Sequence, residues 1–127
     1  MNEESFFIGH EPVFLIYSRL KTELLQRFPE MEIHIAKTQI SFYDRRMFGC
    51  VSFTRVLRKA QMPDKYLTVT LCLPAPIDSN RVAVKVEPYP GRWTHHVVVS
   101  DEKELDKELF SWFEEAHRFA ILRASKP

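Results

Sequence analysis

Apolar residues at steps of three and four predict one helix near each end of the chain. The first series follows a proline suited to an opening turn and predicts a helix over 12–28; it consists of Val13, Ile16, Tyr17, Leu20, Leu24 and Phe28. The second series, which would follow Ser100 as the helix N-cap, consists of Leu105, Leu109, Trp112, Phe113, Ala116 and Ala120. Each helix therefore has one apolar face and is expected to pack on another layer.

Between the helices, apolar residues alternate with polar ones, which is the period of half-buried strands. Strands are predicted at 31–35, 39–43, 50–54, 66–73, 82–87 and 93–99. The apolar residues occupy odd positions from Met31 to Ile35 and even positions at Ile40 and Phe42. A regular strand cannot change phase in this way, so a turn or a bulge is expected at residues 37–39.

The order of the elements is one helix, five or six short strands and one helix. Short connections favour antiparallel neighbours, and two amphipathic helices can cover one face of such a sheet. We therefore expect an α+β fold: a two-layer sandwich whose antiparallel sheet of five or six strands carries the N- and C-terminal helices on one face. Residues 1–127 would form a single domain with an ordered core of about 9–122, and the tail from Arg123 onward would fray.

Composition narrows the class of protein. The chain is 45% apolar, which is ample for one core, and its 18 Lys and Arg nearly balance its 17 Asp and Glu. Such a balance gives no long-range field toward nucleic acid or an anionic membrane, although a local basic patch stays open. Cys50 and Cys72 are expected to be free thiols, and residues 1–8 resemble neither a signal peptide nor a membrane span. A cytoplasmic location is the resulting expectation.

If the helices cover one face of the sheet, the out-of-phase residues form the opposite, open face. These residues are His34, Gln39, Ser41, Tyr43, Cys50, Ser52, Thr54, Thr68, Thr70, Cys72, Thr94 and His96. Few of them carry charge. Either they are simply good strand formers, or they form a weakly polar surface that meets a ligand, a nucleic acid or a second subunit.

The sequence gives little support for a metal site, a nucleophile pair or a phosphate-binding loop. His95 and His96 point to opposite faces of a strand, so both cannot bind one ion, and no metal or cofactor is expected. His95 shares the phase of the core residues and is expected to be buried. A nucleophile pair of Cys50 or Cys72 with His96 is conceivable, but nothing in the local sequence activates either thiol. The three glycines are too far apart for a phosphate loop.

Two basic clusters lie in predicted connections, and with nearby tyrosines they could bind phosphates and stack bases. These clusters are Arg45 with Arg46, and Arg55 with Arg58 and Lys59. Given the balanced net charge, ordinary solvated loops are the favoured interpretation.

Two stretches, AKTQISF at 36–42 and EPYPGRWTHHV at 87–97, resemble the bacterial family named domain of unknown function 5655. The resemblance runs from about Gly9 to Phe119 and implies a small cytoplasmic protein or module with no established activity, cofactor or catalytic residue. The layout is also similar to that of frataxin-like small domains, an analogy that carries no function.

If the two stretches are neighbours in space, their polar residues would line one patch suited to an anionic or carbonyl-bearing ligand. That predicted site consists of Lys37, Gln39, Ser41, Tyr43, Arg92 and His96. We therefore expect a small binding or interaction domain whose partner is an anionic small molecule or another protein. The alternatives are nucleic-acid binding through the two basic clusters, an enzyme built on the same face, and a homodimer through that face.

Overall fold

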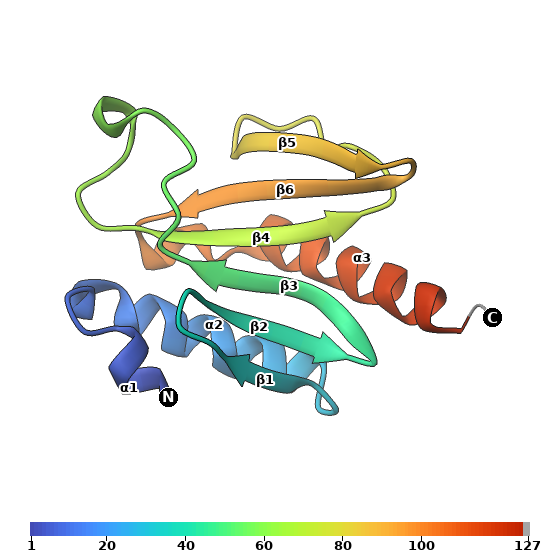
Figure 1. Ribbon diagram of the computed structural model, residues 1–127, viewed down its shortest axis with the longest axis horizontal. Coiled ribbons are helices and arrows are strands. Elements are labelled where there is room, and N and C mark those ends of the chain that lie inside the picture. Colours follow the sequence, from blue (N-terminus) through green and yellow to red (C-terminus); the bar gives the residue numbers. More distant parts are fainter. Residues whose placement is uncertain (126–127) are drawn as a thin grey trace.

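Six strands form one antiparallel sheet in the computed structural model, which describes residues 1–125, and two helices cover one face of it (Figure 1). The helices are α1 (Glu3–Phe6), α2 (Phe14–Arg27) and α3 (Lys107–Ala124), with 3-10 turns η1 (Glu11–Val13), η2 (Lys59–Gln61) and η3 (Glu102–Glu104). The strands are β1 (Glu32–Ile35), β2 (Gln39–Asp44), β3 (Arg46–Ser52), β4 (Leu67–Leu73), β5 (Val82–Tyr89) and β6 (Arg92–Val99). They lie in the order β1-β2-β3-β4-β6-β5, which confirms the expected α+β fold.

The core fills the space between the sheet and helices α2 and α3. Strand residues such as Phe42 and Leu71 and helix residues such as Leu20 and Phe113 are fully buried there. Each such side chain contributes about 1.5–3 kcal/mol of hydrophobic free energy. A Cβ added to Gly49 would lie 3.2 Å from atoms of Leu71 and Phe113, so this glycine allows α3 to pack closely on β3.

The phase change after β1 is a tight hairpin turn, as the sequence predicts. The backbone N–H of Ala36 donates to the carbonyl oxygen of Gln39 over 2.9 Å, and Ile35 pairs with Ile40. A second irregularity follows in β3, where Tyr43 pairs with Met47 while Phe42 pairs with Gly49. The extra residue, Phe48, is buried in the core, and Met47 lies on the open face opposite Tyr43.

Both ends of the described chain extend beyond the expected core of 9–122. Helix α1 is capped by the side chain of Asn2, which accepts from the N–H of Ser5, and Phe6 and Phe7 are buried against Phe53. Two adjacent aromatic residues are too short a signal for periodicity to detect. At the other end, α3 includes Arg123, where fraying was expected; residues 126–127 of the expected tail lie outside the described residues.

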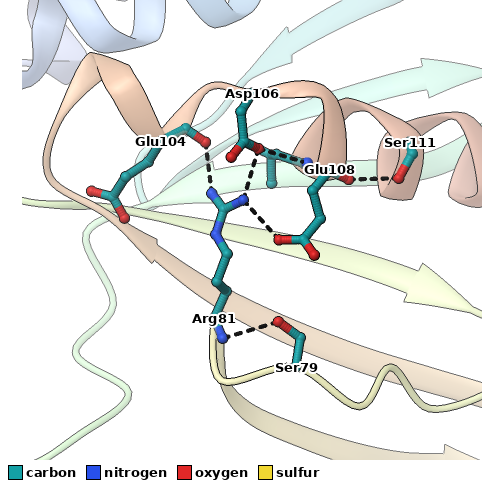
Figure 2. Close-up of polar contacts among 7 residues, drawn as sticks. Ser79, Arg81, Glu104, Asp106, Glu108 and Ser111 are labelled. Atoms are coloured by element: carbon teal, nitrogen blue, oxygen red, sulfur yellow. Dashed lines mark hydrogen bonds and ion pairs between the residues drawn. The ribbon is translucent and has the colours of Figure 1, made fainter.

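The last helix begins later than predicted, because its N-cap is Asp106 and not Ser100. The Asp106 carboxylate accepts from the N–H of Leu109 over 3.0 Å, while residues 102–104 form the separate turn η3. Figure 2 shows the cause: the Arg81 guanidinium donates to Asp106 and Glu108 over 2.7 and 3.1 Å and to the Glu104 carbonyl oxygen over 2.6 Å. This clamp holds the chain in a bend between η3 and α3.

The outer edge strand also departs from the prediction. Its period-two pattern predicts Val82, Val84 and Val86 on one face, but the register shifts between Val82 and Val84. Val82 pairs with Val97 on the core side, whereas Val84 and Val86 lie on the open face. The extra residue at this shift reverses the facing of the residues that follow it, as far as the second register shift after Val86.

Candidate anion-binding site

The open face carries the predicted polar side chains, and a row of them crosses the sheet. Ser41, Cys50, Thr70 and His96 are successive cross-strand partners on β2, β3, β4 and β6. Thr70 Oγ1 lies 2.9 Å from His96 Nδ1. Ser41 and Cys50 are each 5% exposed, so the middle of this face is packed side chain against side chain.

The electrostatics of this row favour neutral side chains. Burial raises the pKa of the Cys50 thiol, outweighing its hydrogen bond with Thr70, and burial lowers the pKa of His96. A nucleophilic thiolate–imidazolium pair requires the opposite shifts. The row therefore supports the sheet by hydrogen bonding and offers no activated group.

A cavity lies on this side of the molecule between three parts of the chain. They are the β2–β3 hairpin, the β5–β6 hairpin and the C-terminal end of α3, which lie at the right side of Figure 1. This cavity, which we call the arginine groove, has a volume of about 440 Å³. Its basic residues are Arg45, Arg46, Arg92 and Arg123. Its other lining residues are Tyr43, Met47, Cys72, Pro88, Tyr89 and Thr94. No carboxylate lines it among the described residues.

Local structure fixes both hairpins of the groove. Arg45 takes the left-handed backbone conformation (φ 67°) at the tip of the β2–β3 hairpin. Such a conformation is unfavourable for a residue other than glycine, so the surrounding contacts must hold it. In the β5–β6 turn, Gly91 supplies a positive φ of 74°, and its N–H donates to the Glu87 carboxylate over 3.0 Å. Arg92 follows directly at the start of β6.

Arg123 is the residue that distinguishes this groove electrostatically. Its guanidinium lies over the Phe119 ring, 4.7 Å from the centroid, and its Nε and Nη2 are buried with no hydrogen-bond acceptor among residues 1–125. Burial lowers the pKa of Arg123; proximity to Cys72 opposes this shift, and the positive charges of Arg92 and Arg46 add to it. The guanidinium nevertheless stays charged, because arginine does not deprotonate in proteins. A partly buried cation beside like charges lowers stability until an anion joins it.

A larger cavity, of about 620 Å³, lies between α2 and the start of α3, but its two arginines are already paired. Arg19 contacts Glu102 at 2.8 Å, and Arg27 contacts Glu23 at 3.1 Å within the lining. Arg27 also contacts Glu114 at 2.9 Å. Because these arginines have carboxylate partners, this cavity has much less attraction for an added anion than the arginine groove.

The structure brings together only part of the sequence-predicted ligand site. Tyr43 and Arg92 line the arginine groove. Gln39 Nε2 donates to the Ser41 hydroxyl over 2.8 Å farther back along β2. His96 lies in the middle of the sheet on β6, outside the lining of the groove.

Lys37 is exposed in the β1–β2 turn, at the opposite end of β2 from Tyr43. The two basic clusters are likewise separated. Arg45 and Arg46 belong to the groove, whereas the second cluster, residues 55–59, lies in the β3–β4 connection at the other end of β3. In that second cluster Arg55, Arg58 and Lys59 are all exposed.

Sequence reasoning missed Arg123 because the tail was expected to fray. One signal was available: Arg123 follows Ala116 and Ala120 at steps of four and three, so it continues the inner face of the helix. A charged residue in an inner-face position needs a partner or a special role.

These features define a two-layer α+β domain with an arginine-lined groove at one end of its open face. A family model described as a domain of unknown function (DUF5655) matches residues 3–120, so the chain belongs to this family and the predicted resemblance is confirmed. No curated protein and no solved structure matches the chain.

Two further findings concern residues 1–125. No helix in this part of the chain has both the length and the apolar character needed to cross a bilayer. Within the same residues, no group of three or more His, Cys, Asp or Glu side chains is placed to hold a metal ion.

Proposed function

We propose that this domain binds an anionic group of a small molecule or a partner in the arginine groove. One observation carries the proposal: two buried N–H groups of Arg123 lack an acceptor within the described chain, beside the charges of Arg92 and Arg46. An unsatisfied buried donor costs about 1–3 kcal/mol, and more when it is charged. A bound anion would recover this free energy.

The two nitrogens also indicate the shape of the anion. Nε and Nη2 lie on the same edge of a guanidinium, where their N–H bonds run parallel and match two oxygens of one carboxylate or phosphate. Both nitrogens are shielded from water, so a small rotation of Arg123 or of a covering side chain must accompany binding.

The attraction of the arginine groove for an anion is local, because the charges of the whole chain nearly cancel. The formal net charge is only +1, so a distant anion meets little overall field. Within the groove, four arginines line one cavity, and the charges of Arg92 and Arg46 act on Arg123. We expect affinity to fall as salt is added, and to depend on individual arginines.

Titration with inorganic phosphate at low ionic strength, followed by NMR and calorimetry, tests the proposal. Arg123→Gln is expected to weaken binding about tenfold or more, because it removes the charge and the fork. Arg118→Gln is the matched control, since Arg118 is exposed on the same helix. The proposal fails if phosphate shifts no groove resonances, or if both variants weaken binding equally.

Single-stranded nucleic acid is a second candidate, because basic residues lie at both ends of β3. Its phosphates would contact Arg45 and Arg46 in the groove and Arg55, Arg58 and Lys59 beyond the other end of the strand. This candidate predicts that oligonucleotide affinity falls steeply with salt and that Arg55→Gln with Lys59→Gln lowers the salt slope. If oligonucleotide affinity and its salt slope are unchanged in the double variant, Arg55 and Lys59 take no part in binding. Only the anion site in the groove would then remain as a proposal.

A further inference from the structure

Apolar and aromatic side chains gather around the arginine groove, which is unusual surroundings for a plain inorganic anion. Tyr89 is 64% exposed and Met47 is 39% exposed, and both line the groove with Pro88. Val86, 48% exposed, lies on the open face opposite Thr94, which is itself a lining residue. These three exposed apolar side chains lie at one end of the sheet, although others, such as Ile8 and Leu15, are exposed elsewhere.

Two tyrosines give the groove its ring surfaces. His34 stacks on Tyr43 with 4.3 Å between ring centroids, so one face of the Tyr43 ring is already covered. Arg92 lies 5.8 Å from the centroid of the Tyr89 ring, close enough for a weak cation–π contact that steadies the ring beside the arginines. An aromatic ligand can thus stack on a tyrosine while its anionic group reaches a guanidinium.

The size of the groove agrees with a ligand larger than one ion. Its volume of about 440 Å³ falls within the range typical of small-molecule sites and exceeds what a single phosphate fills. Small-molecule sites usually combine apolar walls with a few charged groups that fix orientation. The arginine groove has this composition.

We infer that the ligand of the arginine groove is a small aromatic phosphate, whose phosphate meets Arg123 and Arg92 and whose ring stacks on Tyr89 or Tyr43. This inference rests on the proposed anion-binding function and specifies its ligand class. The chemistry is shared by aryl phosphates, with the ring joined directly to the phosphate, and by nucleoside monophosphates, with a sugar between them. Both carry a two-oxygen edge for the guanidinium and a planar ring for stacking.

The test compares dissociation constants for inorganic phosphate, phenyl phosphate and AMP at one low ionic strength. The aromatic ligands are expected to bind about tenfold more tightly than inorganic phosphate, the gain that one stacked ring supplies. Tyr89→Ala with Tyr43→Ala should remove this advantage, so that the variant binds the aromatic phosphates no more tightly than it binds inorganic phosphate. Tyr89→Phe, which keeps the ring, should preserve it, and Arg123→Gln should weaken all three ligands.

Each outcome separates the two proposals. Equal binding of phosphate and aromatic phosphates overturns the ligand class and leaves the anion site in place. An aromatic advantage that survives removal of both tyrosines also overturns it, because the ring then lies elsewhere. No binding of any of the three ligands overturns both proposals. If the class holds, tighter binding of AMP than of phenyl phosphate identifies a nucleotide, and the reverse order identifies an aryl phosphate.

Discussion

His117 Nε2 lies 2.8 Å from Asp44 Oδ2, which joins the last helix to the tip of the β2–β3 hairpin. The imidazole also stacks on Phe28, with 4.3 Å between ring centroids, so a residue after α2 takes part in the same contact. Arg45 follows Asp44 directly, and Arg123 lies farther along the helix that carries His117. This pair therefore sets the distance between the two sides of the arginine groove.

His117→Ala is expected to lower the free energy of unfolding by about 1–3 kcal/mol, because it removes a part-buried hydrogen bond and a stacked ring. It should also weaken phosphate binding by freeing the hairpin. Urea denaturation and phosphate titration measure the two effects, with Arg118→Ala as the exposed control. Wild-type stability in His117→Ala would show that the pair is not a structural link.

Arg81→Met is expected to destabilise the fold by about 1–2 kcal/mol, a modest amount because Asp106 and Glu108 are about half exposed. Arg81→Lys should recover only part of this loss, since lysine lacks the planar fork that reaches three acceptors. Thermal and urea unfolding measure both variants.

Phosphate affinity should stay unchanged in both Arg81 variants, because the clamp lies at the start of α3 and the groove at its end (Figures 1 and 2). The clamp also outweighs the effect of burial and lowers the pKa of Asp106. An NMR titration of Arg81→Met should show this pKa rising. Weaker phosphate binding in Arg81→Lys would contradict the conclusion that the Arg81 clamp and the arginine groove are independent.

Stability is expected to fall as the pH drops below about 6.5, the ordinary pKa of histidine. Burial lowers the pKa of His95 and of His96, so the unfolded chain binds protons in a window where the folded chain does not. Stability is therefore present above this window and is lost as the pH falls through it. The N–H of Ile77 donates to His95 Nε2 over 2.9 Å, a bond that protonation at this nitrogen would break.

Urea denaturation across pH 5–8 measures this dependence. His95→Leu should flatten the slope of stability against pH, whatever its effect on stability at pH 8. His34→Gln is the control, because the His34 side chain is 54% exposed. A slope that His95→Leu leaves unaltered would assign the acid sensitivity to other groups.

The two thiols are expected to differ in reactivity. Cys50 is 5% exposed and burial raises the pKa of its thiol, so it should react slowly with iodoacetamide. Cys72 is half-buried and lines the arginine groove, so it should react about tenfold faster or more. Mass spectrometry of single-cysteine variants Cys50→Ser and Cys72→Ser assigns the rates.

Phosphate should also slow the labelling of Cys72 without affecting Cys50, because an anion in the groove covers the first thiol only. Equal rates for both thiols would contradict the burial described for Cys50. A Cys72 rate that phosphate leaves unchanged would place the anion elsewhere.

The faces of the sheet could be predicted from the sequence because side-chain direction alternates along a strand. The odd-to-even change between Ile35 and Ile40 correctly located a hairpin turn, and the burial of His95 followed from its phase. The facing of Val84 and Val86 could not be predicted, since an inserted residue in an edge strand leaves the alternation of valines intact. The cap at Asp106 was missed because the Arg81 clamp depends on a residue far away in the sequence.

The candidate site was harder to predict than the fold. Two residues of the predicted site, Tyr43 and Arg92, line one cavity, because both fall near hairpin turns. Lys37 was grouped with them although it lies at the opposite end of β2. Periodicity reports which face a residue occupies, but it does not report which hairpins meet at which end of the sheet. Arg123 joins the groove only because α3 runs the full length of the sheet.

The register shifts of β5 have a consequence for association between copies of this chain. An outermost strand with a regular backbone offers unpaired N–H and C=O groups as a template for another chain. In β5 the repeat is interrupted between Val82 and Val84 and again after Val86, and Pro88 lacks an N–H altogether. The edge strand on the opposite side of the sheet, β1, is only four residues long. Neither edge strand presents a long, regular row of unpaired N–H and C=O groups, so the sheet resists growth into fibrils by strand addition.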